Sequence, residues 1–355
     1  MSVLSTPASR GYRMPAEWAP HAATWLSWPR PDGISFPGLP SFDPIDAVWG
    51  RLASLLAQEE AVHINVFDAE HRARVEAALR RHAPATLHPI ALHDFPAYEP
   101  WCRDHGPIFV KRDQGDGGNG GLAVVDWAYN AWGGKYPPHD LDDAVPQHVA
   151  KLLGLPLFTP GIVMEGGSLD VNGEGTLLTT ESCLLNPNRN PHLEKSQIEE
   201  YLREFLGVEK ILWLGDGILG DDTDGHVDDL TRFTGPTTVV TVVEADPADA
   251  NYEPLRENRK RLETMTTAKG QSLTVVDLPM PRALESDGQR LPASYANFYI
   301  ANKQVLVPVF DDPADGPACA ILEKLFPGRR VVPFPARDLI WGLGALHCIT
   351  QQQPA

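Results

Sequence analysis

Apolar and polar residues alternate along this chain in blocks that predict helices and strands in turn. Residues 43–59 carry apolar side chains at the three- and four-residue spacing of an amphipathic helix. Asp43 is the expected N-cap of this helix, and Pro44 its first helical residue. A short apolar run at 61–67 predicts a strand, and residues 70–82 predict a second helix with a basic outer face.

Strand pairs recur further along the chain. Residues 108–111 and 122–127 predict two paired strands, and the Gly- and Asp-rich residues 113–121 between them are expected to form a surface loop. Residues 167–185 predict a hairpin that turns at Asn172-Gly173, a dipeptide typical of tight hairpin turns. The same alternation predicts a hairpin at 298–310, helices at 194–206 and 251–269, a helix that ends at 326, and strands at 211–214, 237–243, 273–276 and 331–334.

Repeated strand pairs with single helices between them favour one mixed α/β domain. The length of 355 residues would allow two domains, but no hinge-like linker divides the chain. The hairpins introduce antiparallel pairs, so strict β-α-β winding is not expected. No glycine-rich nucleotide-binding motif stands between a strand and a helix. We therefore expect a single domain over residues 1–355, with residues 1–12 forming a flexible N-terminus.

The composition limits the partners of the chain. Its 30 basic and 47 acidic residues give a formal charge of −17, which disfavours nucleic acid and anionic membranes and suits a cationic substrate. No apolar run of about 18 residues is present, and residues 1–14 lack the apolar stretch of a signal peptide. The four cysteines are far apart, which disfavours disulfides or a zinc site and fits a reducing cytoplasm. We expect a cytoplasmic protein that binds neither nucleic acid nor membrane, and a homo-oligomer is left open.

Candidate chemistry begins at the last turn of the chain. Gly342 and Gly344 precede Cys348 closely, and glycines allow the backbone to turn sharply and to approach a ligand. A thiol beside such a turn could attack a bound substrate. On this stretch alone, a buried structural cysteine in a C-terminal strand is an equal alternative.

Three other polar stretches carry acids and a histidine. Trp101 stands three residues before Asp104, Glu165 follows an apolar run and precedes two glycines, and His226 stands two residues before Asp228. On a strand, this last spacing would place a titrating base and a fixed anion on the same side. Each stretch also has a structural alternative. The stretch at Trp101 and Asp104 could be a simple turn, Glu165 a solvated strand end, and the stretch at His226 and Asp228 a solvated acidic loop.

The acidic stretch around His226 is not expected to bind calcium. An EF-hand loop would need an acidic ligand at position 220 and a glutamate at 231, where Gly220 and Thr231 stand instead.

The combination of these groups points to a cationic, planar substrate. A cysteine and a histidine with one carboxylate would suit ordinary acyl transfer, but further anions raise the pKa of a thiol and oppose thiolate formation. A guanidinium group explains the extra acids, because its N–H donors fit a carboxylate along each of two edges. Its central carbon would then face the thiol.

Longer motifs are distributed along nearly the whole chain. They are 14–21 (MPAEWAPH), 23–29 (ATWLSWP), 101–107 (WCRDHGP), 130–136 (NAWGGKY), 165–167 (EGG), 215–229, 297–299 (NFY) and 347–352 (HCITQQ). These motifs, in this order, resemble those of agmatine deiminases, which belong to the guanidine-modifying superfamily. The resemblance implies a five-bladed, pseudo-symmetric α/β propeller of ββαβ units around a central site.

The resemblance implies a catalytic role for three residues. Cys348 would be the nucleophile that attacks the guanidinium carbon. His226 would first protonate the departing ammonia as a general acid and then activate water as a base. Glu165 would orient His226.

The resemblance also implies a substrate site and a reaction. Asp104 and Asp228 would grip the guanidinium, Trp101 would line the aliphatic arm of the substrate, and Gly344 would contribute to the binding site. Agmatine and water would give N-carbamoylputrescine and ammonia through a covalent S-amidino adduct, a route to putrescine and polyamines. Neither a metal nor an organic cofactor is expected.

The chain departs from the common family pattern at a few positions, which leaves alternatives open. Leu343 and Ala345 interrupt a glycine-rich approach to the nucleophile, and Cys102 and His105 stand where Met and Thr are common. These changes bear on which guanidine is used. The alternatives are a deiminase of peptidyl-arginine or another alkylguanidine, and a non-catalytic guanidine-binding protein.

The motifs favour agmatine over free arginine, which differs by its α-carboxylate. That carboxylate would need a basic partner. The motifs offer the aromatic side chains of Trp101, Trp132 and Tyr136 and few cations. Arg103 is expected to point away from Trp101, and Lys135 is the other candidate.

Overall fold

A computed structural model describes residues 5–113 and 121–355. Within these residues, four sheets share one strand order, in which an antiparallel pair is followed by a parallel strand. They are β4 (Ile108–Lys111), β5 (Leu122–Val125) and β6 (Leu157–Phe158); β7 (Asp170–Val171), β8 (Thr176–Thr180) and β9 (Lys210–Leu214); β10 (Thr231–Gly235), β11 (Thr238–Val243) and β12 (Thr274–Pro279); and β15 (Tyr299–Ile300), β16 (Gln304–Val309) and β17 (Arg330–Pro335).

A fifth sheet joins the two ends of the chain. Its order is β18 (Gln351–Pro354), β1 (His21–Ser27), β2 (Ala61–Asn65) and β3 (Ile90–His93), with β18 antiparallel to β1 and the other pairs parallel. Trp25 lies opposite Gln351 in this pairing. The last strand thereby fixes the segment just before it, which contains Cys348.

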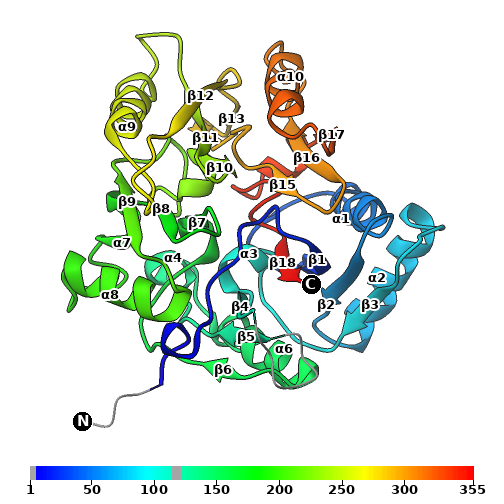
Figure 1. The fold of residues 1–355 in the computed structure, drawn as a ribbon. Coiled ribbons are helices and arrows are strands. Elements are labelled where there is room, and N and C mark those ends of the chain that lie inside the picture. The colour runs from blue at the N-terminus through cyan, green and yellow to red at the C-terminus, as the bar shows by residue number, and fades with distance from the viewer. Residues whose placement is uncertain (1–4, 114–120) are drawn as a thin grey trace.

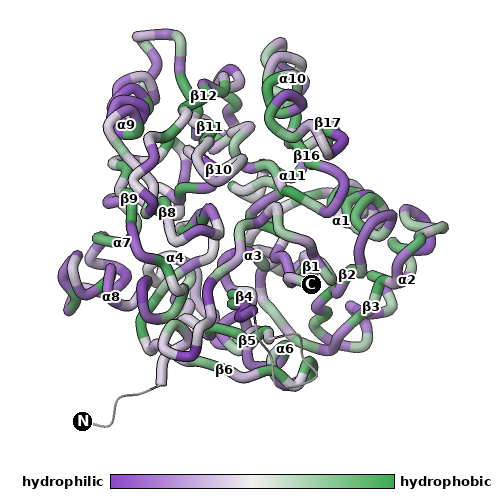
Figure 2. The backbone as a smooth tube through the Cα atoms, viewed as in Figure 1, coloured by the Kyte–Doolittle hydropathy of each residue, from purple (hydrophilic) through white to green (hydrophobic). Residues whose placement is uncertain are grey.

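Each parallel crossover carries a helix. Figure 1 shows these helices toward the outside of the molecule and the strands toward its middle. Helix α9 is mainly hydrophilic (Figure 2), and its buried side chains are confined to one stripe, as expected for a surface helix. The crossover helices are α1 (Asp43–Leu56), α2 (Ala69–His82), α6 (Val145–Leu153), α8 (Lys195–Leu206), α9 (Tyr252–Thr264) and α10 (Asp315–Leu325).

Short elements connect these units. β13 (Glu285–Ser286) and β14 (Gln289–Arg290) form a separate two-stranded hairpin. None of the helices in the described ranges is long and apolar enough to span a membrane. The remaining helices are α3 (Cys102–His105), α4 (Ala131–Gly134), α5 (Asp140–Asp143), α7 (Glu181–Leu184), α11 (Arg337–Ile340), and 3-10 turns at Ala8–Arg10, Gly166–Ser168 and Val227–Asp229.

The first helix begins at Asp43 as predicted and ends at Leu56, but the predicted N-cap is wrong. Phe42 occupies the N-cap position and makes no side-chain cap, while Asp43 and Pro44 lie in the first turn. The acidic side chain still lies near the positive end of the helix dipole, so a favourable interaction remains. The pattern did not predict the side-chain cap of helix α2. In this cap, Asp68 accepts a hydrogen bond from the backbone N–H of His71.

Most predicted hairpins and crossover helices are confirmed. The hairpin at Asn172-Gly173 forms between β7 and β8, although the chain enters α7 after Thr180 instead of continuing as a strand. Helix α6 and strand β10 were not predicted. The expected loop falls largely on residues 114–120, outside the described residues. Residues 1–4 are also outside them, so flexibility of residues 1–12 stays a prediction.

Candidate active site

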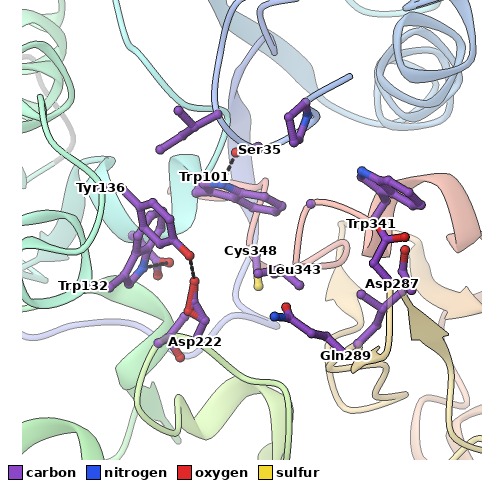
Figure 3. Close-up of a pocket in the computed structure, with 18 residues that line it drawn as sticks. Ser35, Trp101, Trp132, Tyr136, Asp222, Asp287, Gln289, Trp341, Leu343 and Cys348 are labelled. Carbon is purple, nitrogen blue, oxygen red and sulfur yellow. Dashed lines mark hydrogen bonds between the residues drawn. The ribbon is translucent and has the colours of Figure 1, made fainter. Parts of the chain in front are cut away.

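A pocket of about 260 Å³ opens between segments that are far apart in sequence. In Figure 3, Trp101 and Cys348 lie near its centre, Trp132, Tyr136 and Asp222 lie on one side, and Gln289, Asp287 and Trp341 lie on the other. The lining residues are Ile34, Ser35, Pro37, Trp101, Asp104, Trp132, Tyr136, Asp222, Thr223, Ser286, Asp287, Gln289, Leu291, Trp341, Gly342, Leu343, Gly344 and Cys348.

The turn before Cys348 packs against the indole of Trp101. A Cβ atom on Gly344 would lie 2.4 Å from Cζ3 of Trp101, so the residue must be glycine for the two segments to meet in this way. Leu343 has a φ of 70°, in the left-handed region that favours glycine. Gly344, Trp101 and Cys348 all line the pocket, and their roles in binding and attack stay predictions.

Asp104 lies on helix α3 and is held by two donors from other segments. Its Oδ1 accepts the backbone N–H of Gly167 at 2.9 Å, and its Oδ2 accepts Nε1–H of Trp132 at 2.9 Å. The pKa of Asp104 is raised to about 6, chiefly by burial; within that net value, the nearby His226 lowers the pKa and the anion of Asp228 raises it. Asp104 is therefore a fixed carboxylate at the pocket wall above that pH.

His226 lies in the loop before the 3-10 turn, not on the predicted strand. Its Nδ1 is 3.6 Å from Oδ1 of Asp104, and its Nε2 is 3.9 Å from Oε2 of Glu165. Both distances exceed hydrogen-bond length, so neither ring nitrogen has a bonded partner among the described residues. Burial lowers the pKa of His226, but the field of Asp104, together with contacts to Cys183 and Glu165, outweighs it and leaves the pKa well above the ordinary value. The ring can thus carry a proton for transfer.

Glu165 is the second anion beside His226. Its Oε1 accepts Nε–H of Arg189 at 2.6 Å, and Arg189 also binds Asp224 at 2.7 Å. Burial raises the pKa of Glu165, but the guanidinium of Arg189 outweighs that effect and leaves the pKa below its ordinary value. The free Oε2 lies 3.9 Å from Nε2 of His226, and the orienting role of Glu165 stays a prediction.

Asp228 lies beside the sulfur of Cys348. Its Oδ2 is 3.8 Å from the sulfur and accepts Nδ1–H of His347 at 2.7 Å. The Nε2 of His347 is 2.7 Å from Oε2 of Glu17, which comes from the N-terminal segment. Burial raises the pKa of Asp228, but the hydrogen bond from His347 leaves it below the ordinary value. Its Oδ1 is buried without a hydrogen-bond partner in the described residues.

The thiol of Cys348 is surrounded by acids. Burial, followed by the charges of Asp228, Asp229 and Asp104, raises the pKa of Cys348 well above its ordinary value. The neutral thiol is therefore the form expected in the free protein.

The predicted site residues come together in two layers. Trp101, Asp104, Gly344 and Cys348 line the pocket, whereas His226, Glu165 and Asp228 lie buried behind its wall. The expectation for Arg103 is confirmed: Nη1 donates to Gln352 at 2.7 Å, and the side chain points away from the pocket. Lys135 does not line the pocket either and forms an ion pair with Asp224 at 2.9 Å.

Several site residues were not assigned by sequence reasoning. Asp222 accepts a hydrogen bond from the hydroxyl of Tyr136 at the pocket wall, and Asp287 lies at the tip of the β13–β14 hairpin. Arg189 carried no signal in sequence, because its partner Glu165 is 24 residues away. Asn297 and Glu17 fall inside recognised motifs, but only their contacts show where they act.

Two groups of side chains have the donor types that hold metals. They are Glu165, Cys183 and His226, and separately Asp228, Asp229 and Cys348, with ligand atoms within 4.8 Å of one another. Both groups include an atom expected to take part in proton transfer or nucleophilic attack. A bound ion there would compete with those steps.

The chain is similar to known deiminases over its full length. A family model described as Porphyromonas-type peptidyl-arginine deiminase matches residues 13–354. Agmatine deiminase of Ectopseudomonas mendocina (strain ymp) is 40% identical over 381 residues, covering 100% of this chain and 98% of that protein. The agmatine deiminase of Pseudomonas aeruginosa (strain LESB58) is also 40% identical, and the match covers 99% of this chain and 98% of that protein.

Solved structures agree with this assignment. Agmatine deiminase of Enterococcus faecalis, described as catalysing its reaction, superimposes with a TM-score of 0.91 at 35% identity and covers 99% of this chain and 98% of that one. A Cys-to-Ser variant of C. jejuni agmatine deiminase with substrate bound gives a TM-score of 0.85 at 29% identity. The match covers 97% of this chain and 96% of that one. The mixed α/β fold matches these structures, and the predicted resemblance is confirmed. This chain therefore belongs to the Porphyromonas-type peptidyl-arginine deiminase family.

Proposed function

We propose that this protein hydrolyses agmatine to N-carbamoylputrescine and ammonia. The observation that carries the proposal is that the Cys348 sulfur lines the same pocket as Asp104 and lies 3.8 Å from Oδ2 of Asp228. Full-length similarity to agmatine deiminases supports the same reaction.

The pocket suits a substrate with two positive charges. Asp104 and Asp228 would bind the guanidinium, and Trp101 would pack along the aliphatic arm. Asp222 and Asp287 also line the pocket, and either carboxylate could balance the distal ammonium of agmatine. None of the described lining residues is Lys or Arg, so the α-carboxylate of arginine would lack a partner.

The first half of the reaction would form a covalent adduct. When the cationic substrate binds, the Cys348 thiol loses its proton to solvent water. The resulting thiolate attacks the guanidinium carbon and gives a neutral tetrahedral intermediate. The imidazolium of His226 then transfers a proton to one amino group, which leaves as ammonia. The product is an S-amidino adduct on Cys348, and His226 is left neutral, with Glu165 holding its orientation.

The second half would hydrolyse this adduct. Neutral His226 takes a proton from water as the oxygen attacks the amidino carbon. Collapse of the second tetrahedral intermediate breaks the C–S bond and regenerates the thiolate. The substituted urea leaves after it loses one proton, and ammonia takes up that proton as ammonium. The overall change is one water consumed and one ammonium released for each agmatinium.

The five sheets support a propeller arrangement as part of this proposal. Four share a ββαβ order and the fifth is completed by β18, so each unit would form one blade of a single domain over residues 1–355. The sheets are not joined to one another by strand pairing in the described ranges, which fits separate blades. A cytoplasmic location and the absence of nucleic-acid binding remain predictions, and a homo-oligomer is still left open.

Peptidyl-arginine is the second candidate substrate, favoured by the description of the family model. Its backbone would have to lie at the pocket mouth, near the partly exposed Trp341 and the β13–β14 hairpin.

Ammonia release from agmatine tests the proposal. The wild-type protein should release ammonia and carbamoylputrescine in equal amounts, and Cys348→Ala should release neither. Cys319→Ala is the matched control, since Cys319 is a buried thiol on helix α10 that does not line the pocket, and it should remain active. Turnover by Cys348→Ala would exclude the covalent route.

A further inference from the structure

The side-chain amide of Asn297 contacts the nucleophile, and the proposed mechanism does not use this contact. It is fully buried just before strand β15. Its Nδ2 lies 3.1 Å from the sulfur of Cys348 and 3.0 Å from Oδ1 of Asp229. The amide therefore bridges the reacting sulfur and one of the acids around it.

Two backbone contacts fix which end of the amide faces the sulfur. The Oδ1 of Asn297 accepts the backbone N–H of His347 at 2.9 Å and that of Cys348 at 3.3 Å. A backbone N–H can only donate, so the oxygen must face these groups. The NH₂ group must then face the sulfur and Asp229, and both of its N–H bonds have an acceptor.

The contact favours the charged form of the sulfur. A thiolate accepts hydrogen bonds strongly, whereas a thiol accepts weakly. The acids that face the sulfur, Asp104, Asp228 and Asp229, all oppose the thiolate. A neutral donor held against the sulfur offsets part of this field and adds no second positive charge to compete with the substrate.

We propose that Asn297 is a catalytic residue whose side-chain N–H binds the Cys348 sulfur and stabilises its thiolate. This deepens the proposed function and rests on it for the reaction. The same bond would act twice in a turnover. It would stabilise the sulfur as the thiolate forms under the bound guanidinium, and again as the C–S bond breaks and the thiolate leaves.

Titration of the thiol tests this proposal without any substrate. The rate of Cys348 alkylation by iodoacetamide is measured against pH, with Cys102→Ala, Cys183→Ala and Cys319→Ala as the common background. Asn297→Ala and Asn297→Asp both remove the donor, and only the second adds a carboxylate. A hydrogen bond to a charged group contributes about 1.5–3 kcal/mol, so both variants should move the midpoint upward by about one to two pH units.

A matched control separates this effect from general damage. Asn172 is also buried, and its Oδ1 accepts two backbone N–H groups while its Nδ2 donates to the carbonyl of Pro236, in a turn outside the pocket. Asn172→Asp should leave the alkylation midpoint unchanged. Melting temperatures are measured for each protein, and Asn297→Leu, which also has no N–H or O–H donor, replaces any Asn297 variant that does not fold.

The outcomes separate this proposal from the proposed function. An unchanged midpoint in folded Asn297→Ala, or a rise confined to Asn297→Asp, would overturn the role of Asn297, because the second result reflects added charge. A rise in both variants, with a roughly tenfold or greater fall in kcat for agmatine and little change in KM, supports it. If the wild-type protein does not hydrolyse agmatine, the proposed function fails while the alkylation midpoints still decide the thiolate contact.

Discussion

At the residue scale, the nucleophile is placed among acids instead of bases. Burial and the charges of Asp228, Asp229 and Asp104 keep the thiol of Cys348 neutral in the free protein. A bound guanidinium adds the positive charge that the site lacks. The thiolate is then expected to form only when a cationic substrate is present, which protects the sulfur from other electrophiles.

Asp228→Asn should lower kcat/KM for agmatine by roughly ten- to a hundredfold, because the charge-assisted contact with the guanidinium is lost. The remaining amide can still face His347, so the fold should be kept. Steady-state kinetics measure the effect, with Asp126→Asn as a control for loss of a buried carboxylate outside the pocket. A change of less than threefold in Asp228→Asn would exclude this residue as a guanidinium ligand.

The activity should depend on pH through Asp104. Burial raises its pKa to about 6, and binding of the guanidinium requires its ionised form. As the pH falls through about 6, Asp104 gains a proton, so kcat/KM for agmatine should fall by roughly tenfold per unit below that value. Melting temperatures at each pH exclude unfolding as the cause. In Asp104→Asn this step should vanish; an unchanged step would assign the titration to another group.

At the element scale, short turns bring the acids together. The 3-10 turn Gly166–Ser168 lies against the catalytic groups, and a Cβ on Gly167 would be 2.5 Å from Nδ1 of His226 and 2.7 Å from Oδ1 of Asp104. The glycine therefore allows the histidine and the carboxylate to share one small space.

Gly167→Ala should reduce kcat/KM for agmatine strongly, because the methyl group displaces His226 or Asp104. Overpacking of this kind typically destabilises a protein by about 1–3 kcal/mol. Gly328→Ala is the control, since a Cβ there meets no atom within 4 Å and its φ is not in the left-handed region. Thermal melting and steady-state kinetics are compared for the two variants. Wild-type kinetics in Gly167→Ala would contradict the packing described for the site.

Helices and strands could be predicted where the local spacing of apolar residues and the turn residues determine them. Site residues could be predicted only where they fall inside a recognised sequence motif. Helix α8 was predicted almost to the residue because Gly207 ends it in the left-handed conformation. Helix α6 was missed although its apolar face is well formed, because proline and short polar turns precede it. The strand expected at His226 is a loop, since Asp221 and Thr223 bind its backbone N–H. Long-range contacts such as His347 with Glu17 leave no local signal.

At the scale of the whole molecule, the site exists only when both ends of the chain meet. The pairing of β18 with β1 holds the segment of Cys348, and Glu17 from the N-terminal segment holds His347 beside it. The remaining groups come from other sheets and their loops (Figure 1). The net charge of −17 adds a long-range field that favours a dication over zwitterionic arginine.

Direct competition between agmatine and arginine tests the central claim, namely that this site deiminates agmatine through Cys348. The wild-type protein is given both compounds at equal concentration, and carbamoylputrescine and citrulline are quantified over time. An unpaired carboxylate in a buried site is a strong basis for rejection, so carbamoylputrescine should form at least about a hundredfold faster, and Cys348→Ala should form neither product. Comparable citrulline formation, faster turnover of an arginine-containing peptide, or product from Cys348→Ala would contradict the account.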